Sequence, residues 1–167
     1  MKAWKNQKGF SMVEIIIVFA ILAILTTAGL SMIGYISNAN TRKVTQTLDK
    51  QLSRQQIESM SKAEDSYLYI YKADDGCCYM RSLNEEITSY DSTKFTTDGV
   101  KLCGTNVNIK MESGTQVDSS NFICIKYKKN GTFDTTKTNT KEITIDGNRD
   151  FVVNLYKDTG RHIMKEV

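Results

Sequence analysis

The first part of the chain consists of a long apolar run preceded by basic residues. Residues 15–36 carry no formal charge, and Lys2, Lys5 and Lys8 stand before them. At ~1.5 Å per residue, a helix over this run would be about 33 Å long, which is enough to cross a bilayer. Because basic residues favour the cytoplasmic side, we expect residues 1–8 to stay in the cytoplasm and everything after Ile36 to lie outside it.

The next stretch, residues 37–63, has the periodicity of an amphipathic helix. It contains no Gly and no Pro, and its charged residues avoid one apolar stripe. The members of that stripe are Val44, Leu48, Leu52 and Ala63, with Met60 beside it. The pattern predicts one helix from about residue 10 to residue 63, whose second half lies on a sheet. A coiled coil would need a sustained heptad repeat, which three or four positions do not supply.

From Ser66 onward the pattern changes to short aromatic and β-branched runs separated by turn dipeptides. The predicted strands are 67–72, 77–82, 107–111, 122–128, 142–145, 151–156 and 161–164. The turns between them include Asp75-Gly76, Ser113-Gly114, Asn130-Gly131, Asp146-Gly147 and Thr159-Gly160. These elements predict an α+β protein with an antiparallel sheet packed on the outer half of the helix. Ser82 and Glu85 have the spacing of a capping box, which predicts one helical turn between strands.

Length and composition narrow the class of protein. A chain of 167 residues with 40% hydrophobic and 25% charged residues holds one ordinary domain and a short accessory segment. This excludes a multidomain enzyme. The formal charge of +3 is too small to indicate nucleic-acid binding.

Glu14 does not fit a purely apolar membrane anchor, because this acidic residue stands next to the start of the uncharged run. A carboxylate in a membrane helix costs about 2.5–3.5 kcal/mol at the bilayer centre and less near the interface. Glu14 therefore either reaches the headgroups as a boundary residue or has a partner.

The neighbouring residues favour a partner. The run Lys8-Gly9-Phe10-Ser11-Met12-Val13-Glu14, followed by Ile15-Ile16-Ile17-Val18, resembles the prepilin signature of type IV pilins and pseudopilins. The resemblance implies the pilin fold and cleavage between Gly9 and Phe10 by a membrane prepilin peptidase, which also methylates the Phe10 amine. It further implies that Glu14 pairs with the Phe10 amine of an adjacent subunit in a filament.

This resemblance implies a domain organisation and a set of partners. Residues 1–9 would be a cleaved leader, 10–36 the membrane and assembly helix, 37–63 an amphipathic continuation, and 64–167 a β-rich extracytoplasmic head. The partners would be the prepilin peptidase, other pilin subunits, and the cytoplasmic membrane with its pilus assembly platform. The subunit would lie in that membrane before assembly and at the cell surface in a pilus afterwards.

A second resemblance concerns residues 122–161. The segments Phe122-Ile-Cys-Ile, Asn130-Gly-Thr-Phe133, Glu142-Ile-Thr-Ile145 and Phe151-Val-Val are similar to the C-terminal hairpins of minor pseudopilins and FimT-like minor pilins. The resemblance favours a minor subunit whose function is filament assembly. Three consecutive hairpins of any origin would produce a similar pattern.

Other interpretations remain open. A pseudopilin of a competence or type II secretion system would share the first 60 residues, and a membrane-anchored binding module would not start at Phe10. Residues 37–39 (Ser-Asn-Ala) fit a general signal peptidase site, but the apolar run is longer than a usual signal core. An uncleaved single-pass anchor is a further alternative. Loss of the leader would remove three Lys and no acid, which leaves 19 basic and 19 acidic residues from the original 22 and 19.

The four cysteines, Cys77, Cys78, Cys103 and Cys124, all lie in the predicted outer domain, where oxidation is permitted. A bridge between the vicinal cysteines would be strained, so we expect Cys77 or Cys78 to pair with Cys103 or Cys124. Four buried free thiols are the alternative. Zinc is disfavoured, because the chain has one His and no CxxC spacing.

The sequence contains little that indicates catalysis. It has no phosphate-binding loop, HExxH or GxSxG motif, and we expect its single histidine, His162, to be a surface or edge residue without a partner. Lys126, Lys128 and Lys129 form a small basic hairpin, which we interpret as a solvated edge. Asn130-Gly-Thr132 fits a glycosylation sequon and is better explained as a turn. We therefore predict no enzyme activity, no cofactor and no metal, and infer no specific nucleic acid or small-molecule ligand.

Overall fold

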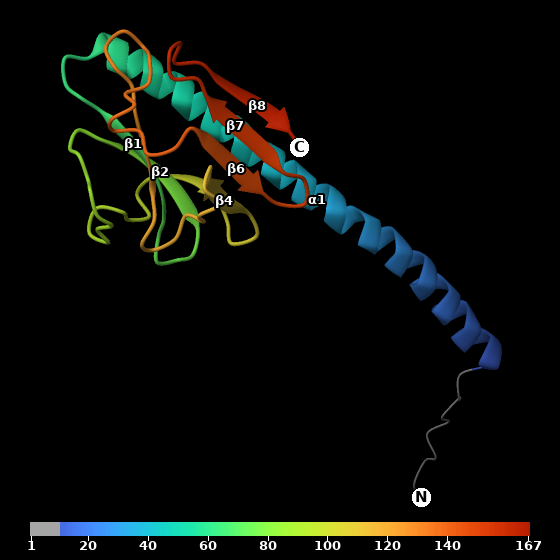
Figure 1. Cartoon of the computed structure of the whole chain (residues 1–167). Helices are drawn as coiled ribbons and strands as arrows, with labels where there is room; N and C mark the ends of the chain where they lie inside the picture. Colours follow the sequence, from blue (N-terminus) through green and yellow to red (C-terminus); the bar gives the residue numbers. More distant parts are fainter. Residues whose placement is uncertain (1–10) are drawn as a thin grey trace, which may run out of the picture. The chain divides into compact units, whose positions relative to one another are not determined.

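The computed structural model describes residues 11–167 and the side chains of residues 11–27 and 39–167. The predicted cleavage site at Gly9 and Phe10 lies outside this range. The chain divides into two units, Met1–Ile36 and Ser37–Val167. The second unit contains all the strands (Figure 1).

One long helix, α1 (Met12–Ser61), is present where the sequence predicts a helix over residues 10–63. Within the second unit its buried face comprises Thr41, Val44, Thr45, Leu48, Leu52, Gln55 and Ser59. The predicted stripe is thus confirmed at Val44, Leu48 and Leu52. It is wrong at Ala63, which is exposed because α1 ends two residues earlier, at Ser61. The last buried positions of α1 are polar.

The first sheet has the strand order β3-β2-β1-β5 and is antiparallel throughout. Its strands are β1 (Tyr67–Lys72), β2 (Cys78–Leu83), β3 (Val100–Cys103) and β5 (Ile123–Lys126). The β1–β2 hairpin turns at Asp75-Gly76, where Gly76 has φ +76°. That left-handed conformation is one that glycine adopts without steric cost, which explains the turn dipeptide.

The second sheet is also antiparallel and has the order β4-β6-β7-β8. Its strands are β4 (Asn108–Met111), β6 (Glu142–Asp146), β7 (Phe151–Leu155) and β8 (His162–Glu166). The last three are consecutive in the chain, and β6 and β7 lie side by side in Figure 1. β8 is an edge strand and pairs with β7.

Both sheets contribute to one hydrophobic core. Val44, Leu48 and Leu52 of α1 belong to the same buried cluster as residues of β1, β5, β6 and β7. The members from those strands include Leu68, Ile70, Ile123, Ile125, Ile143, Ile145 and Val153, each no more than 2% exposed. A large apolar side chain buried in this way stabilises a fold by about 1.5–3 kcal/mol, so this cluster is a main source of stability.

The other face of the first sheet carries a separate aromatic cluster. Tyr69 and Tyr71 alternate along β1 with the core residues and contact Phe95, Tyr71 stacked on it at a centroid distance of 4.6 Å and Tyr69 tilted against it at 5.6 Å. Residues 84–98 cover this face, and two phenols hold them there. The hydroxyl of Tyr69 accepts a hydrogen bond from the Ile87 N–H (2.7 Å), and that of Tyr71 donates one to the Thr96 carbonyl (2.6 Å). Strand β1 is therefore buried on both faces of the sheet.

The α+β class and the antiparallel pairing are confirmed, with three differences. The head has two four-stranded sheets where one was predicted. Strand β3 was not predicted, because Val100–Cys103 is short and half exposed. The capping box at Ser82 is wrong, since Ser82 lies inside β2 and its hydroxyl donates to Gln55 Oε1 (2.7 Å).

Candidate functional site

The start of α1 contains the described part of the predicted processing and assembly site. The hydroxyl of Ser11 accepts a hydrogen bond from the Val13 N–H (3.3 Å), and the Ser11 carbonyl accepts one from the Ile15 N–H (3.2 Å). Ser11 is therefore the N-cap, and Glu14 stands at the third helical position. A Ser-x-x-Glu sequence is a capping box, so this role of Ser11 was readable from the sequence although we did not predict it.

Glu14 is exposed and has no ion-pair partner within residues 11–167. Its negative charge lies in the first turn of α1, where the positive end of the helix dipole favours an acid. The carboxylate is therefore compatible with the helix start and still available to a group on another molecule.

The first residues of α1 expose large apolar side chains around the whole helix. Met12 is 80% exposed, Phe19 67% and Ile24 69%, and their apolar neighbours Val13, Ile15, Ile16, Ile17, Val18, Ile21, Leu22 and Leu25 are all at least 46% exposed. A helix that is apolar on every side needs an apolar environment, either lipid or other helices.

Among the residues that the structure describes, no helix has the length and apolar character to cross a membrane. The predicted span over residues 10–36 stays a prediction.

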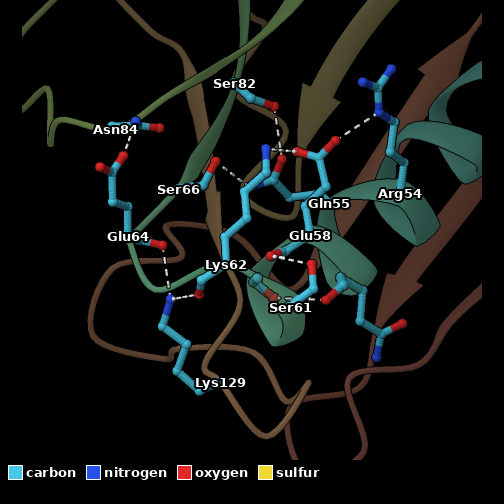
Figure 2. Close-up of polar contacts among 12 residues, drawn as sticks. Arg54, Gln55, Glu58, Ser61, Lys62, Glu64, Ser66, Ser82, Asn84 and Lys129 are labelled. Atoms are coloured by element: carbon cyan, nitrogen blue, oxygen red, sulfur yellow. Dashed lines mark hydrogen bonds and ion pairs between the residues drawn. The ribbon is translucent and has the colours of Figure 1, made fainter.

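The end of α1 is tied to the first sheet by buried polar contacts (Figure 2). Gln55 is 2% exposed, and both ends of its amide are used. Its Nε2 donates to Ser66 Oγ (2.9 Å), and its Oε1 accepts from Ser82 Oγ (2.7 Å). These bonds offset the cost of burying an amide and fix the helix against β1 and β2.

Two lysines of the basic hairpin contact the segment that follows α1. Lys129 Nζ donates to the carbonyl oxygens of Lys62 (2.6 Å) and Glu64 (2.8 Å), just past the end of α1 (Figure 2). Lys126 Nζ lies 2.8 Å from Asp65, and its side chain is 12% exposed. The interpretation as a solvated edge is confirmed for Lys128 and Lys129, which are exposed, and it is wrong for Lys126, because the ammonium of Lys126 is mostly buried against Asp65.

His162 lies on the edge strand β8, as predicted, but the expectation of an exposed side chain without a partner is wrong. Its side chain is 9% exposed, and Nε2 lies 3.1 Å from Asp49 Oδ1 and 3.2 Å from Ser53 Oγ. Asp49 and Ser53 are one helical turn apart on α1, whereas His162 is on β8, so the contact depends on tertiary structure. Both partners meet the same ring nitrogen. A Ser-His-Asp triad needs them on different nitrogens, so the geometry does not support nucleophilic catalysis.

The four cysteines are buried free thiols, and the sheet separates them into two pairs. Cys78 and Cys103 belong to the main core, while Cys77 and Cys124 belong to the aromatic cluster on the opposite face. Burial raises the pKa of Cys124 to about 11. The Cys103 thiol lowers the pKa of its neighbour Cys78, and the pKa of Cys103 is correspondingly raised.

Within residues 11–167, no group of three or more His, Cys, Asp or Glu side chains is arranged so that it could hold a metal ion. The absence of zinc stays a prediction.

One comparison with known proteins gives a match. Residues 4–30 match the family model described as the prokaryotic N-terminal methylation motif. No curated protein and no solved structure matches the chain. The motif indicates a type IV pilin-like leader, typical of substrates of the prepilin peptidase, and it covers the predicted cleavage site and Glu14.

Proposed function

We propose that this chain is a minor subunit of a type IV pilus or related filament. In this proposal the prepilin peptidase cuts between Gly9 and Phe10 and methylates the new amine, and the mature chain assembles through α1. The observation that carries the proposal is the methylation motif over residues 4–30, which includes the apolar first part of helix α1.

The exposed side chains of α1 supply the reason for assembly. Each large apolar residue of Met12–Leu25 that moves from water into contact with lipid or another helix gains about 1.5–3 kcal/mol. The same surface suits both the cytoplasmic membrane before assembly and a bundle of helices afterwards. Transfer between the two environments would therefore cost little in hydrophobic free energy.

Glu14 supplies the specificity of assembly in this proposal. A carboxylate in an apolar bundle is stable when an opposite charge satisfies it. The methylated amine of Phe10 on a neighbouring subunit is such a charge. Loss of the leader also brings the formal charge to zero, so the mature chain carries no net repulsion between copies.

The assignment to a minor subunit is supported by residues 122–161, whose sequence resembles the C-terminal hairpins of minor pseudopilins and FimT-like minor pilins and which contain the paired strands β6 and β7. A minor subunit should be sparse in filaments sheared from cells, whereas a major pilin should dominate them by mass. Quantitative mass spectrometry of sheared filaments distinguishes these cases.

The processing step is tested by co-expression of the full chain with a prepilin peptidase. We expect intact-mass measurement to show loss of residues 1–9 and gain of one methyl group. Gly9→Leu should stay uncut, because the peptidase reads a small residue before the cut, and Gly9→Ala is the matched small control. A mature protein that starts at Met1 or Asn40 would contradict the proposal.

A further inference from the structure

Cys78 and Cys103 occupy directly opposed positions on the antiparallel strands β2 and β3. Opposed residues of an antiparallel pair have Cα atoms about 4.5 or 5.5 Å apart, depending on the type of pair. Disulfides form across Cα separations of about 4.4–6.8 Å. Both side chains also point to the same face of the sheet, since both belong to the main core.

The other pairings fail on geometry. Cys77 and Cys124 point to the opposite face from Cys78 and Cys103, so neither can reach across the sheet. Cys77 and Cys124 share a face, but the strand order β3-β2-β1-β5 puts β1 between them. Two strand spacings amount to about 9.5 Å, which exceeds the ~7 Å limit for a bridge.

We propose that Cys78 and Cys103 are a disulfide pair that links β2 to β3 in the oxidised protein, while Cys77 and Cys124 stay free thiols. This inference rests on strand register and does not depend on the proposed filament function.

The fold gives this bridge a role. Strand β3 has four residues, lies at the edge of its sheet, and exposes Val100 by 44%. Its pairing with β2 is interrupted by a bulge between Cys78 and Tyr79, so few backbone bonds hold it. The bridge would also close residues 79–102 into a loop. That loop contains the 84–98 segment that covers the aromatic cluster.

An oxidant can approach the pair from the side of Cys103. Cys103 lines an open groove of about 420 Å³ between α1 and β3, together with Lys43, Val44, Lys101 and Leu102. The two lysines suit an anionic disulfide such as glutathione disulfide.

The reaction is two consecutive thiol–disulfide exchanges with an external disulfide oxidant. The Cys103 thiolate attacks one sulfur of glutathione disulfide, and a mixed disulfide forms while one glutathione thiolate leaves. The Cys78 thiolate then attacks Cys103 Sγ, and the second glutathione leaves as a thiolate. The protein loses two electrons and two protons, and the oxidant is reduced to two glutathione thiols.

The test uses the full chain in detergent, reduced and then equilibrated with glutathione disulfide and alkylated with N-ethylmaleimide. Trypsin places Cys77 and Cys78 in the peptide 73–81, Cys103 in 102–110 and Cys124 in 111–126. We expect a crosslink of 73–81 to 102–110 in most molecules, with alkylation of Cys124. Because one peptide holds two cysteines, fragment ions must assign the crosslink to Cys78 and the alkyl group to Cys77.

Single variants give an independent assignment. Cys77→Ser and Cys124→Ser should keep the crosslink, and Cys78→Ser and Cys103→Ser should lose it. A crosslink that persists in Cys78→Ser, any bridge to Cys124, or four alkylated or glutathionylated thiols in the wild type would overturn the proposal. The peptide map of the wild-type protein tests the proposed pairing even if a variant fails to fold.

Discussion

His162 on the C-terminal strand lies 3.1 Å from Asp49 on helix α1, measured from Nε2 to Oδ1. β8 has no other strand neighbour than β7 within residues 11–167. The His162–Asp49 contact therefore attaches the end of the chain to the helix that carries the apolar surface.

His162→Ala should destabilise the full chain by about 1–3 kcal/mol, because it leaves the partly buried Asp49 and Ser53 without their partner. Urea unfolding in detergent measures this loss. Hydrogen exchange at residues 162–166 should rise at the same time, since β8 loses its attachment.

The control for this variant is an ion pair between the β6–β7 turn and strand β8. Arg149 and Glu166 form an ion pair whose side chains are 61% and 49% exposed. Such pairs contribute about 0–1 kcal/mol, so Arg149→Ala should change stability far less than His162→Ala. Equal effects of the two variants would contradict the importance of the His162 contact.

Gly160→Ala should be among the most destabilising single changes in the head. Gly160 has φ +66°, and an added Cβ would collide with the carbonyl oxygen of Gly131 and lie 2.8 Å from Gln56 Nε2. That same Gln56 nitrogen donates to the Gly131 carbonyl (2.8 Å), so neither neighbour can move freely. We expect the free energy of unfolding, measured with urea, to fall by more than about 2 kcal/mol in Gly160→Ala.

Gly114→Ala separates backbone strain from steric collision. Gly114 has φ +77°, but a Cβ there would have no atom within 4 Å. The free energy of unfolding of Gly114→Ala should fall by only about 1–2 kcal/mol, the cost of placing alanine in the left-handed region. If the two alanine variants lose the same free energy, the close approach of Gly160 to Gly131 is not important for stability.

Alkaline pH should destabilise the head. Burial raises the pKa of Tyr71 to about 12, and it raises that of Tyr69 and Tyr127 as well. The unfolded chain releases these protons near pH 10, whereas the folded protein keeps them. The contribution of these phenols to the free energy of unfolding is fully present below pH 10. It falls as pH rises from 10 to 12, by up to about 1.4 kcal/mol per pH unit for each phenol.

The measurement is the free energy of unfolding against pH for wild type, Tyr71→Phe and Tyr156→Phe. Tyr71→Phe should flatten the alkaline slope, and Tyr156→Phe should leave it unchanged because Tyr156 is 49% exposed. A wild-type stability that is constant from pH 10 to 12 contradicts this prediction.

Lys129→Ala should fray the end of α1. The exposed ammonium of Lys129 donates to two carbonyl groups that follow the helix, a contribution of about 0.3–1 kcal/mol for an exposed cation at a helix C-terminus. Lys128 is the neighbouring exposed lysine and serves as the matched control. Hydrogen exchange over residues 58–64 should increase in Lys129→Ala and not in Lys128→Ala.

The sequence predicted the elements of this fold better than their contacts. β1 and the starts of β6 and β7 were placed correctly, because hydrophobic alternation and turn dipeptides are local signals. The division into two sheets was not predicted, since nothing local distinguishes strands of one sheet from strands of another. The partners of His162 and the cap formed by Lys129 are more than 60 residues away in the chain, so no spacing could indicate them.

Glu14 is the residue for which the alternatives make different predictions, and three variants distinguish them. If Glu14 is a boundary residue, Glu14→Ala should leave filament incorporation unchanged. If it stabilises only the helix start, Glu14→Ala should reduce incorporation but Glu14→Gln should not, because glutamine also serves at the third position of a capping box.

We predict the third outcome, in which both variants insert into the membrane and are cut normally but enter filaments poorly. The reason is that either change leaves the charged Phe10 amine of a neighbouring subunit without its partner in an apolar bundle. Glu14→Asp, which keeps the charge on a shorter side chain, should recover part of the loss. The measurement is the ratio of sheared filament to membrane-bound subunit, which should fall at least about tenfold in Glu14→Ala and Glu14→Gln, the effect of 1.4 kcal/mol. A normal ratio in Glu14→Gln would remove the charge pairing from the proposed assembly mechanism, while the cleavage site would be unaffected.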